Sequence, residues 1–267
     1  MDKLRGKVAI ITGGAGGIGR AYALRLALLG ADVAIVDIDL AVAARFGEVL
    51  TAASVMEEIK SLGGRSIGVE ADLSQQTQAI DAIDKIAEEF GRIDILVNNA
   101  GGAITPIDRS RSSDTPVDDT DKLFAVNFYS MVHCCQAAAP HLRKQGGVVV
   151  NIATTNIDRT PVGGRLAMYS SAKAAVLRYT QCLAVELGPD GVRVNCISPG
   201  IIESARIKAQ AAARNLGTDA QAKANPLRRL GTPEDCAGVL EFLVTDLSRY
   251  VTGECVRVSG GATLVSS

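Results

Sequence analysis

The 267-residue chain is predicted to fold as a single α/β domain in which helices cover both faces of a parallel sheet. Seven short apolar runs that suit buried strands alternate with longer segments of helical period. The first run ends in a glycine-rich turn that leads directly into a helix, an order typical of open parallel sheets. The length suits one large core and is short for two, so we expect one domain over residues 1–267.

The period of the apolar residues assigns each element in turn. A strand inside a parallel sheet is covered on both faces, so it reads as a continuous apolar run. Residues 7–11 form such a run, and further strands are predicted at residues 31–36, 66–70, 93–97, 147–152, 192–197 and 255–258. Helical periodicity predicts helices at residues 20–29, 75–90, 121–143, 166–187 and 233–243.

Three stretches depart from this simple alternation. Residues 39–62 are longer than a crossover needs and hold two short helical pieces around Gly47, so we expect a surface elaboration. Residues 104–121 are polar and contain two prolines, which predicts a loop. Residues 203–226 are Ala-rich, weakly amphipathic and bounded by turn signals, and we expect them to form a lid over the site.

Composition argues against several classes of partner. A net charge of −1 without blocks of like charge offers no surface for nucleic acid or an anionic membrane. No apolar run reaches the roughly 18 residues that span a bilayer. The six cysteines are scattered without a C-x-x-C pair and accompany only two histidines, so neither a metal site nor a disulfide framework is expected. With no signal peptide evident, we expect a cytoplasmic protein.

The glycine-rich turn and the acid after the second strand predict a dinucleotide site. Gly13, Gly17 and Gly19 lie between strand and helix, where N–H groups at a helix N-terminus can face a pyrophosphate. Asp37 ends the second strand, where a carboxylate can accept hydrogen bonds from the adenosine ribose. The same carboxylate would repel a 2′-phosphate, so the sequence favours NAD over NADP.

Tyr169 and Lys173 are the candidates for proton transfer. They lie one helical turn apart and therefore share a face of the predicted helix 166–187. A phenol with a pKa of about 10 is a poor acid or base at neutral pH, and a nearby ammonium lowers that pKa toward the working range. The spacing alone is a weak signal, because most Tyr-x-x-x-Lys pairs lie on surfaces.

Other polar candidates lie where strands end or inside a helix. Asp72, followed by Leu73, could reach an adenine amino group from the end of the third strand. Asn98 and Asn99 follow the fourth strand, and Asn98 could brace the strand ends; for Asp72 and Asn98 a turn-forming role is equally compatible. Asn127 lies among apolar neighbours and must find hydrogen-bond partners, by ordering a water or by kinking its helix.

Taken in order, these motifs resemble the short-chain dehydrogenase/reductase family over roughly residues 6–262. The motifs are Thr12-Gly13-x-x-x-Gly17-Ile18-Gly19, Asn98-Asn99-Ala100-Gly101, Asn127, Tyr169-x-x-x-Lys173 and Pro199-Gly200. The resemblance implies a Rossmann-type, doubly wound sheet of seven parallel strands. It also implies hydride transfer between NAD(H) and a secondary alcohol or ketone, in a homotetramer or homodimer.

The resemblance further implies the roles of individual residues. Tyr169 would be the catalytic acid/base, Lys173 would lower its pKa and hold the nicotinamide ribose, and Asn127 would order a water behind Lys173. The cofactor residues that it implies, beyond the glycine turn and its Ile18, are Asp37, Asp72, Leu73, Asn99, Tyr169, Lys173, Pro199, Ile202 and Ser204.

One position departs from the family pattern. The family usually has a Ser just after the fifth strand, whereas here Ala153, Thr154, Thr155 and Asn156 follow the strand. Alignment on the strand assigns the role to Thr154, and alignment on the distance to Tyr169 assigns it to Asn156. We favour Thr154, because a hydroxyl can both donate a hydrogen bond to a reacting oxygen and accept one from it.

Two alternative functions remain open from the sequence. A nucleotide-binding regulator or scaffold without turnover would explain the missing Ser, but not the intact Tyr169, Lys173 and Asn127. An NADPH-dependent ketoreductase would use the same chemistry, and Asp37 argues against it.

Overall fold

The computed structural model describes residues 3–214 and 216–264, and its core is one seven-stranded parallel sheet. The strand order is β3-β2-β1-β4-β5-β6-β7, with every neighbouring pair parallel. The strands are β1 (Val8–Thr12), β2 (Asp32–Asp37), β3 (Ser66–Glu70), β4 (Ile95–Asn98), β5 (Val148–Ile152), β6 (Arg193–Pro199) and β7 (Cys255–Val258). The order reverses between β1 and β4, which creates a crevice at the carboxyl ends of these two strands. The predicted fold class is confirmed.

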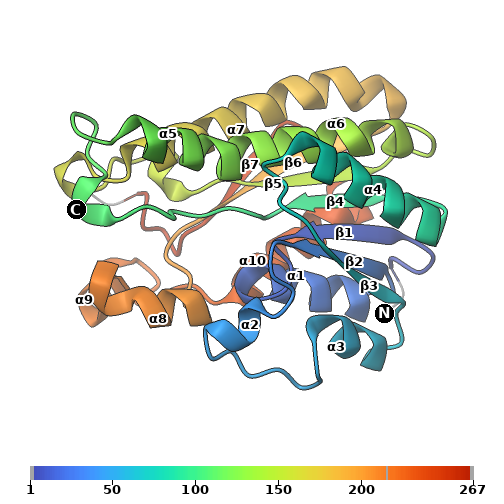
Figure 1. Ribbon diagram of the computed structural model, residues 1–267, viewed down its shortest axis with the longest axis horizontal. Coiled ribbons are helices and arrows are strands. Elements are labelled where there is room, and N and C mark those ends of the chain that lie inside the picture. The colour runs from blue at the N-terminus through green and yellow to red at the C-terminus, as the bar shows by residue number, and fades with distance from the viewer. Residues whose placement is uncertain (1–2, 215, 265–267) are drawn as a thin grey trace.

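Helices cover both faces of this sheet (Figure 1), with α4, α6 and α7 on one face and α1, α3 and α10 on the other. The helices are α1 (Gly17–Leu28), α2 (Val42–Arg45), α3 (Val55–Ser61), α4 (Gln76–Phe90), α5 (Val117–Phe124), α6 (Ser130–Leu142), α7 (Ala167–Leu187), α8 (Ala205–Arg214), α9 (Asp219–Ala224) and α10 (Pro233–Val244). Short 3₁₀ turns occupy Ile107–Arg109, Thr155–Ile157, Val162–Gly164, Gly188–Asp190 and Asp246–Ser248.

Each face of the sheet has its own apolar core. Successive strand residues point to opposite faces, so Ile10 and Leu96 pack under α4 and α6, while Ile11 and Val97 pack against α1 and α10. All four side chains are fully buried. This double cover explains why the central strands β1 and β4 are mostly apolar, and it holds their ends rigidly together.

The prediction of a loop over residues 104–121 is wrong at its end, because α5 begins at Val117. Pro116 precedes the helix, and Asp118 and Asp119 lie in its first turn. Acidic side chains there are favourable beside the positive end of the helix dipole, which outweighs the polar, loop-like composition.

The predicted helix over residues 121–143 is interrupted. Residues Ala125–Tyr129 form a π-helix between α5 and α6, and Asn127 is buried at its centre. Such wide turns are rare and occur mostly as single insertions in α-helices. None of the helices in the described part of the chain has the length and apolarity needed to cross a membrane.

Candidate active site

The glycine-rich turn connects β1 to α1 in a conformation that larger residues would disrupt. Gly13 and Gly17 have φ values of 61° and 57°, in the left-handed region. A Cβ at Gly19 would lie 2.0 Å from the Gly13 carbonyl oxygen. Asn99 Nδ2 donates to that oxygen at 2.8 Å and to the Thr12 oxygen at 3.2 Å. The turn is therefore held against the end of β4, with Ile18 following it in the first turn of α1.

Gly19→Ala is expected to destabilise the protein by about 2 kcal/mol or more, because the new methyl group overlaps the turn backbone. Chemical denaturation monitored by circular dichroism measures this change. Gly238→Ala provides the matched control, since a Cβ at this α10 position meets nothing within 4 Å. We expect the control to be more stable than wild type by about 0.5–1 kcal/mol. Equal effects in the two variants would contradict the packing argument.

Asp37 ends β2 beside the glycine turn. Its Oδ2 accepts a hydrogen bond from the Ala15 N–H at 3.1 Å, and burial raises the pKa of the carboxyl above its ordinary value. The N–H groups of Ala15, Ile38 and Asp39 oppose that rise. The carboxylate thus lies at the carboxyl end of β2, where the sequence predicted a ribose contact.

The start of the predicted lid lies beside the same turn. Pro199 ends β6, Ile202 is buried, and a Cβ at Gly17 would lie 3.6 Å from Ser204 Cβ. From α8, Arg206 donates to the Gly101 oxygen at 3.3 Å, and its guanidinium lies 5.7 Å from the centroid of the Phe46 ring. The segment after β6 therefore contacts the segment after β2, through Arg206 and Phe46, at the carboxyl ends of the strands.

Tyr169 and Lys173 lie on α7, whose first turn contains Tyr169. Lys173 is buried, and its Nζ donates to the carbonyl oxygen of Ile152, the last residue of β5, at 2.7 Å. Burial lowers the pKa of Lys173 from 10.5 to about 8, because water no longer solvates the ammonium. Tyr169 is half-buried. The pair is therefore part of the interior rather than a solvated surface pair.

The N-terminus of α7 is held by a residue that the sequence analysis missed. Leu166 has a φ of 58°, an uncommon conformation for a side chain of this size. The buried Ser110 accepts the Leu166 N–H on its hydroxyl at 3.2 Å and the Ala167 N–H on its carbonyl at 3.1 Å. Ser110 thus fixes the first turn of α7 and with it Tyr169. Its position in a Ser-rich loop carried no signal of this contact.

Asn127 finds its partners in the backbone. Its Nδ2 donates to the oxygens of Gly102 at 3.0 Å and Leu123 at 2.9 Å, and its Oδ1 accepts from the Gly102 N–H at 2.8 Å. The side chain therefore ties the π-helix to the loop after β4. Its role in ordering a water behind Lys173 stays a prediction.

Thr154 follows β5 at the position assigned from the strand. It is buried, and its Oγ1 accepts the Asn156 N–H at 3.4 Å, as the N-cap of the short turn Thr155–Ile157. Thr155 is also buried, and Asn156 is half-buried. Thr154 keeps its hydroxyl at the end of β5, close in sequence to the carbonyl that Lys173 binds.

Asp72 makes an Asx turn before α4. Its Oδ1 accepts the N–H of Ser74 at 3.0 Å and the Ser74 hydroxyl at 2.7 Å. Leu73 is buried, and its carbonyl oxygen lies 3.1 Å from Nδ1 of His133. Similarly, Asn98 braces strand ends by donating to Asn151 Oδ1 at 2.8 Å. The turn-forming and bracing roles are present, and an adenine contact by Asp72 stays a prediction.

A second set of residues missed by the sequence analysis lies against the start of α1. Residues 38–54, here called the strap, follow β2 and contain α2. Glu48 Oε2 from the strap accepts the Gly17 N–H at 2.7 Å, and its Oε1 accepts from Arg20 Nη1 at 3.1 Å. The extra length of residues 39–62 was recognisable in the sequence, but this contact was not.

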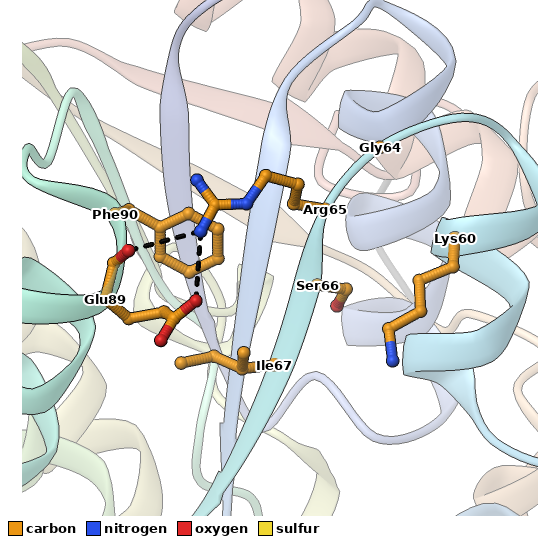
Figure 2. Close-up of a pocket in the computed structure, with 7 residues that line it drawn as sticks. All are labelled: Lys60, Gly64, Arg65, Ser66, Ile67, Glu89 and Phe90. Atoms are coloured by element: carbon orange, nitrogen blue, oxygen red, sulfur yellow. Dashed lines mark hydrogen bonds and ion pairs between the residues drawn. The ribbon is translucent and has the colours of Figure 1, made fainter.

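A separate pocket of about 300 Å³ lies beside the edge strand β3 (Figure 2). The Arg65 guanidinium covers the Phe90 ring at 4.7 Å and pairs with Glu89 at 2.9 Å. Its lining consists of Lys60, Gly64, Arg65, Ser66, Ile67, Glu89 and Phe90. It contains none of the predicted site residues, so we regard it as a structural feature of the sheet edge.

The chain was compared with known proteins. Residues 13–263 match the family described as "Enoyl-(Acyl carrier protein) reductase". The chain is 46% identical to "Cyclohexanol dehydrogenase" of Rhodococcus sp. (strain TK6) over 97% of each chain. It superposes with a TM-score of 0.83 on a 7α-hydroxysteroid dehydrogenase complexed with NADH and 7-oxo glycochenodeoxycholic acid, at 32% identity over 97% of this chain and 94% of the other.

A third comparison is with NAD⁺-bound xylitol dehydrogenase, which has a TM-score of 0.84 at 27% identity over 97% of this chain and all of the other. The similarity extends over nearly the whole length in each case, and the glycine turn and α7 lie within the residues 13–263 that match the family. The chain belongs to the short-chain dehydrogenase/reductase family of oxidoreductases.

Proposed function

We propose that the protein oxidises a secondary alcohol to a ketone with NAD, or catalyses the reverse reduction. The observation that carries the proposal is the buried Lys173 ammonium, bound to the end of β5 and one turn from Tyr169. Burying an ammonium is unfavourable, so its retention in an apolar interior points to a functional demand.

Tyr169 acts in this proposal as the acid/base. Lys173 stays protonated below a pH of about 8 and favours the phenolate of Tyr169, which can then take the proton of the substrate hydroxyl. The hydroxyl of Thr154 at the end of β5 holds the substrate oxygen and donates to it as negative charge develops. Asn127 holds the loop after β4 in place.

The turn after β1 fits a dinucleotide. Gly13 and Gly17 adopt φ values in the left-handed region, where the absence of a side chain lets the backbone approach a ligand, and the Asp37 carboxylate binds the Ala15 N–H of the same turn. Pro199, Ile202 and Ser204 would contact the nicotinamide end, since Ser204 lies next to Gly17. When bound, NAD supplies the hydride acceptor, and the protein supplies its position and the proton transfer.

The substrate is proposed to be an apolar, cyclic secondary alcohol. The relative that is 46% identical is called a cyclohexanol dehydrogenase, and a relative of known structure is a steroid dehydrogenase. Large apolar side chains are exposed in the loops before α5 and α7, Ile104 at 45% and Val162 at 83%. Assembly as a homotetramer or homodimer stays a prediction, which light scattering would test.

The direct test is absorbance at the reduced-nicotinamide band while protein with NAD is offered secondary alcohols of cyclic, aromatic, hydroxy-acid and sugar types. Turnover of the cyclic alcohols is the expected result. Binding of NAD without turnover of any alcohol or ketone would favour the non-catalytic alternative. The presence of Thr154 at the position of the family's usual Ser would then be the first feature to test as the cause.

Asp37→Ser is expected to shift the cofactor preference toward NADP, because removing the carboxylate removes its repulsion of a 2′-phosphate and its hydrogen bonds to the ribose. We expect NADPH to bind at least about tenfold tighter relative to NADH, which corresponds to about 1.4 kcal/mol. Asp39→Ser is the matched control, since Asp39 pairs with Arg45 in the same loop. An unchanged ratio of the NADPH affinity to the NADH affinity in Asp37→Ser, or an equal change in Asp39→Ser, would show that Asp37 is not the selector.

A further inference from the structure

The carboxylate of Glu48 occupies the N-terminus of α1, next to the turn proposed to bind the cofactor. Its Oε2 lies 2.7 Å from the Gly17 nitrogen and 3.3 Å from where a Cβ of Gly16 would lie. Val42 and Ala43 of α2 cover Gly16 from the same side. The strap thus brings a negative charge onto the turn itself.

Arg20 fixes this carboxylate in place. Its Nη1 binds Glu48, while its Nε and Nη2 form a bidentate pair with Glu58 at 2.7 and 2.6 Å. Glu58 is buried and also accepts the N–H and hydroxyl of Thr51 at 2.6 and 2.7 Å. Burial alone would raise the pKa of Glu58. The pKa is nevertheless about 2, because Arg20 and Thr51 stabilise the negative charge of the carboxylate. Arg20 therefore binds both carboxylates and holds Glu48 in a fixed position relative to Glu58.

Glu48 and Asp37 hold N–H groups only two residues apart on the same turn. Asp37 Oδ2 binds the Ala15 N–H, and Glu48 Oε2 binds the Gly17 N–H. A ribose held by Asp37 would therefore lie near a second carboxylate, that of Glu48, on the same turn. Arg20 carries one positive charge and pairs with two carboxylates, Glu48 and Glu58, so it does not neutralise both of them.

We infer that Glu48 is a second cofactor-selecting residue, which lowers the affinity for NADP(H) more than the affinity for NAD(H). The inference rests on the proposed dinucleotide function. Both cofactors carry the same pyrophosphate, so any repulsion of that group by Glu48 cancels from the ratio of affinities. The 2′-phosphate adds further negative charge to NADP(H) alone, and its repulsion by Glu48 remains in the ratio.

The test is a fluorescence titration of the purified protein with NADH and with NADPH, at low and high salt. Glu48→Gln keeps an oxygen that can accept the Gly17 N–H while removing the charge. We expect the affinity for NADPH relative to NADH to rise about fivefold, which is about 1 kcal/mol. The rise should shrink toward 1 M salt, where the screening length falls to about 3 Å. Glu48→Asp keeps the charge and should retain the wild-type ratio.

Glu57→Gln is the matched control, because it removes the same charge from the neighbouring α3, where Glu57 pairs with Lys60 away from the turn. The affinity of this control for NADPH relative to NADH should equal that of wild type. An unchanged ratio in Glu48→Gln, or equal shifts in Glu48→Gln and Glu57→Gln, would overturn the inference even if wild type prefers NADH. A wild type without preference for NADH would instead contradict the proposed cofactor, and the comparison of the two Gln variants would still decide the role of Glu48.

Discussion

Tyr169→Phe is expected to lower turnover by about 10³-fold, within the range of 10²–10⁴ that a positioned acid or base contributes. The substitution removes one oxygen and leaves the ring, so the first turn of α7 and its contacts with Ser110 should persist. Because Lys173 and the expected cofactor contacts on other elements are unchanged, the affinity for NADH should change by less than about threefold. Steady-state rates with an alcohol from the panel, together with NADH titration, measure both quantities.

Tyr179→Phe is the control for this experiment. Tyr179 lies further along α7, where its ring packs edge-on against Phe128 at 6.1 Å, and burial raises its pKa. The control should retain wild-type turnover. If Tyr169→Phe kept more than one tenth of the wild-type rate, the substrate proton would have to leave by another group, and the proposed mechanism would be wrong.

Lys173→Met is expected to abolish measurable turnover and to change the pH dependence of stability. The pKa of Lys173 is about 8 in the folded protein and 10.5 as its ordinary value. Below pH 8 both states hold the proton, and the folded state bears the full cost of burying it. Between pH 8 and 10.5 the unfolded state binds more protons, so wild-type stability rises with pH in this window.

The size of this rise follows from the two pKa values. The difference between a pKa of 10.5 and one of about 8 corresponds to about 3 kcal/mol, at 1.36 kcal/mol for each factor of ten in proton affinity. The Met variant lacks the titrating group, so its stability relative to wild type should fall by about that amount between pH 7.5 and 10.5. Denaturant unfolding of both proteins at several pH values measures the difference between their free energies of unfolding. Other titrating groups are the same in both proteins, so their contributions cancel from this difference.

Lys122→Met is the matched control, because Lys122 is exposed on α5 and pays no cost of burial. Its stability relative to wild type should not vary with pH. A Lys173→Met variant that also shows no such variation would mean that the ammonium is better solvated than its contacts indicate. Loss of turnover in that variant would then still support its functional role.

The elements that could be predicted from the sequence are those determined by residues close to one another in the chain. Strands β3 and β7 begin and end where the apolar runs do, and α4 begins one residue after the predicted start. Each is bounded by turn residues that can be recognised in the sequence. The glycine-rich turn between the first strand and the first helix was predicted from the same local information, and it connects β1 to α1.

The contacts that could not be predicted join residues far apart in the chain. Ser110 and Leu166 are 56 residues apart, and Gly17 and Glu48 are 31 apart. Neither Ser110 nor Glu48 lies in a recognisable motif, and each acts by accepting a backbone N–H. Any Ser, Asp or Glu in a loop has this capacity, so only the three-dimensional path of the loop reveals which of them uses it.

The π-helix at residues 125–129 sets the phase of the polypeptide on either side of it. The buried positions Asp119, Leu123, Asn127, Met131 and Cys135 recur every four residues. In a straight α-helix each such step overshoots a full turn by about 40°, so Cys135 would lie about 160° away from Asp119. The single extra residue of the wide turn removes about 100° of that drift. Deleting one residue from this turn would therefore rotate α5 relative to α6, so that only one of them could keep its present face toward the protein interior.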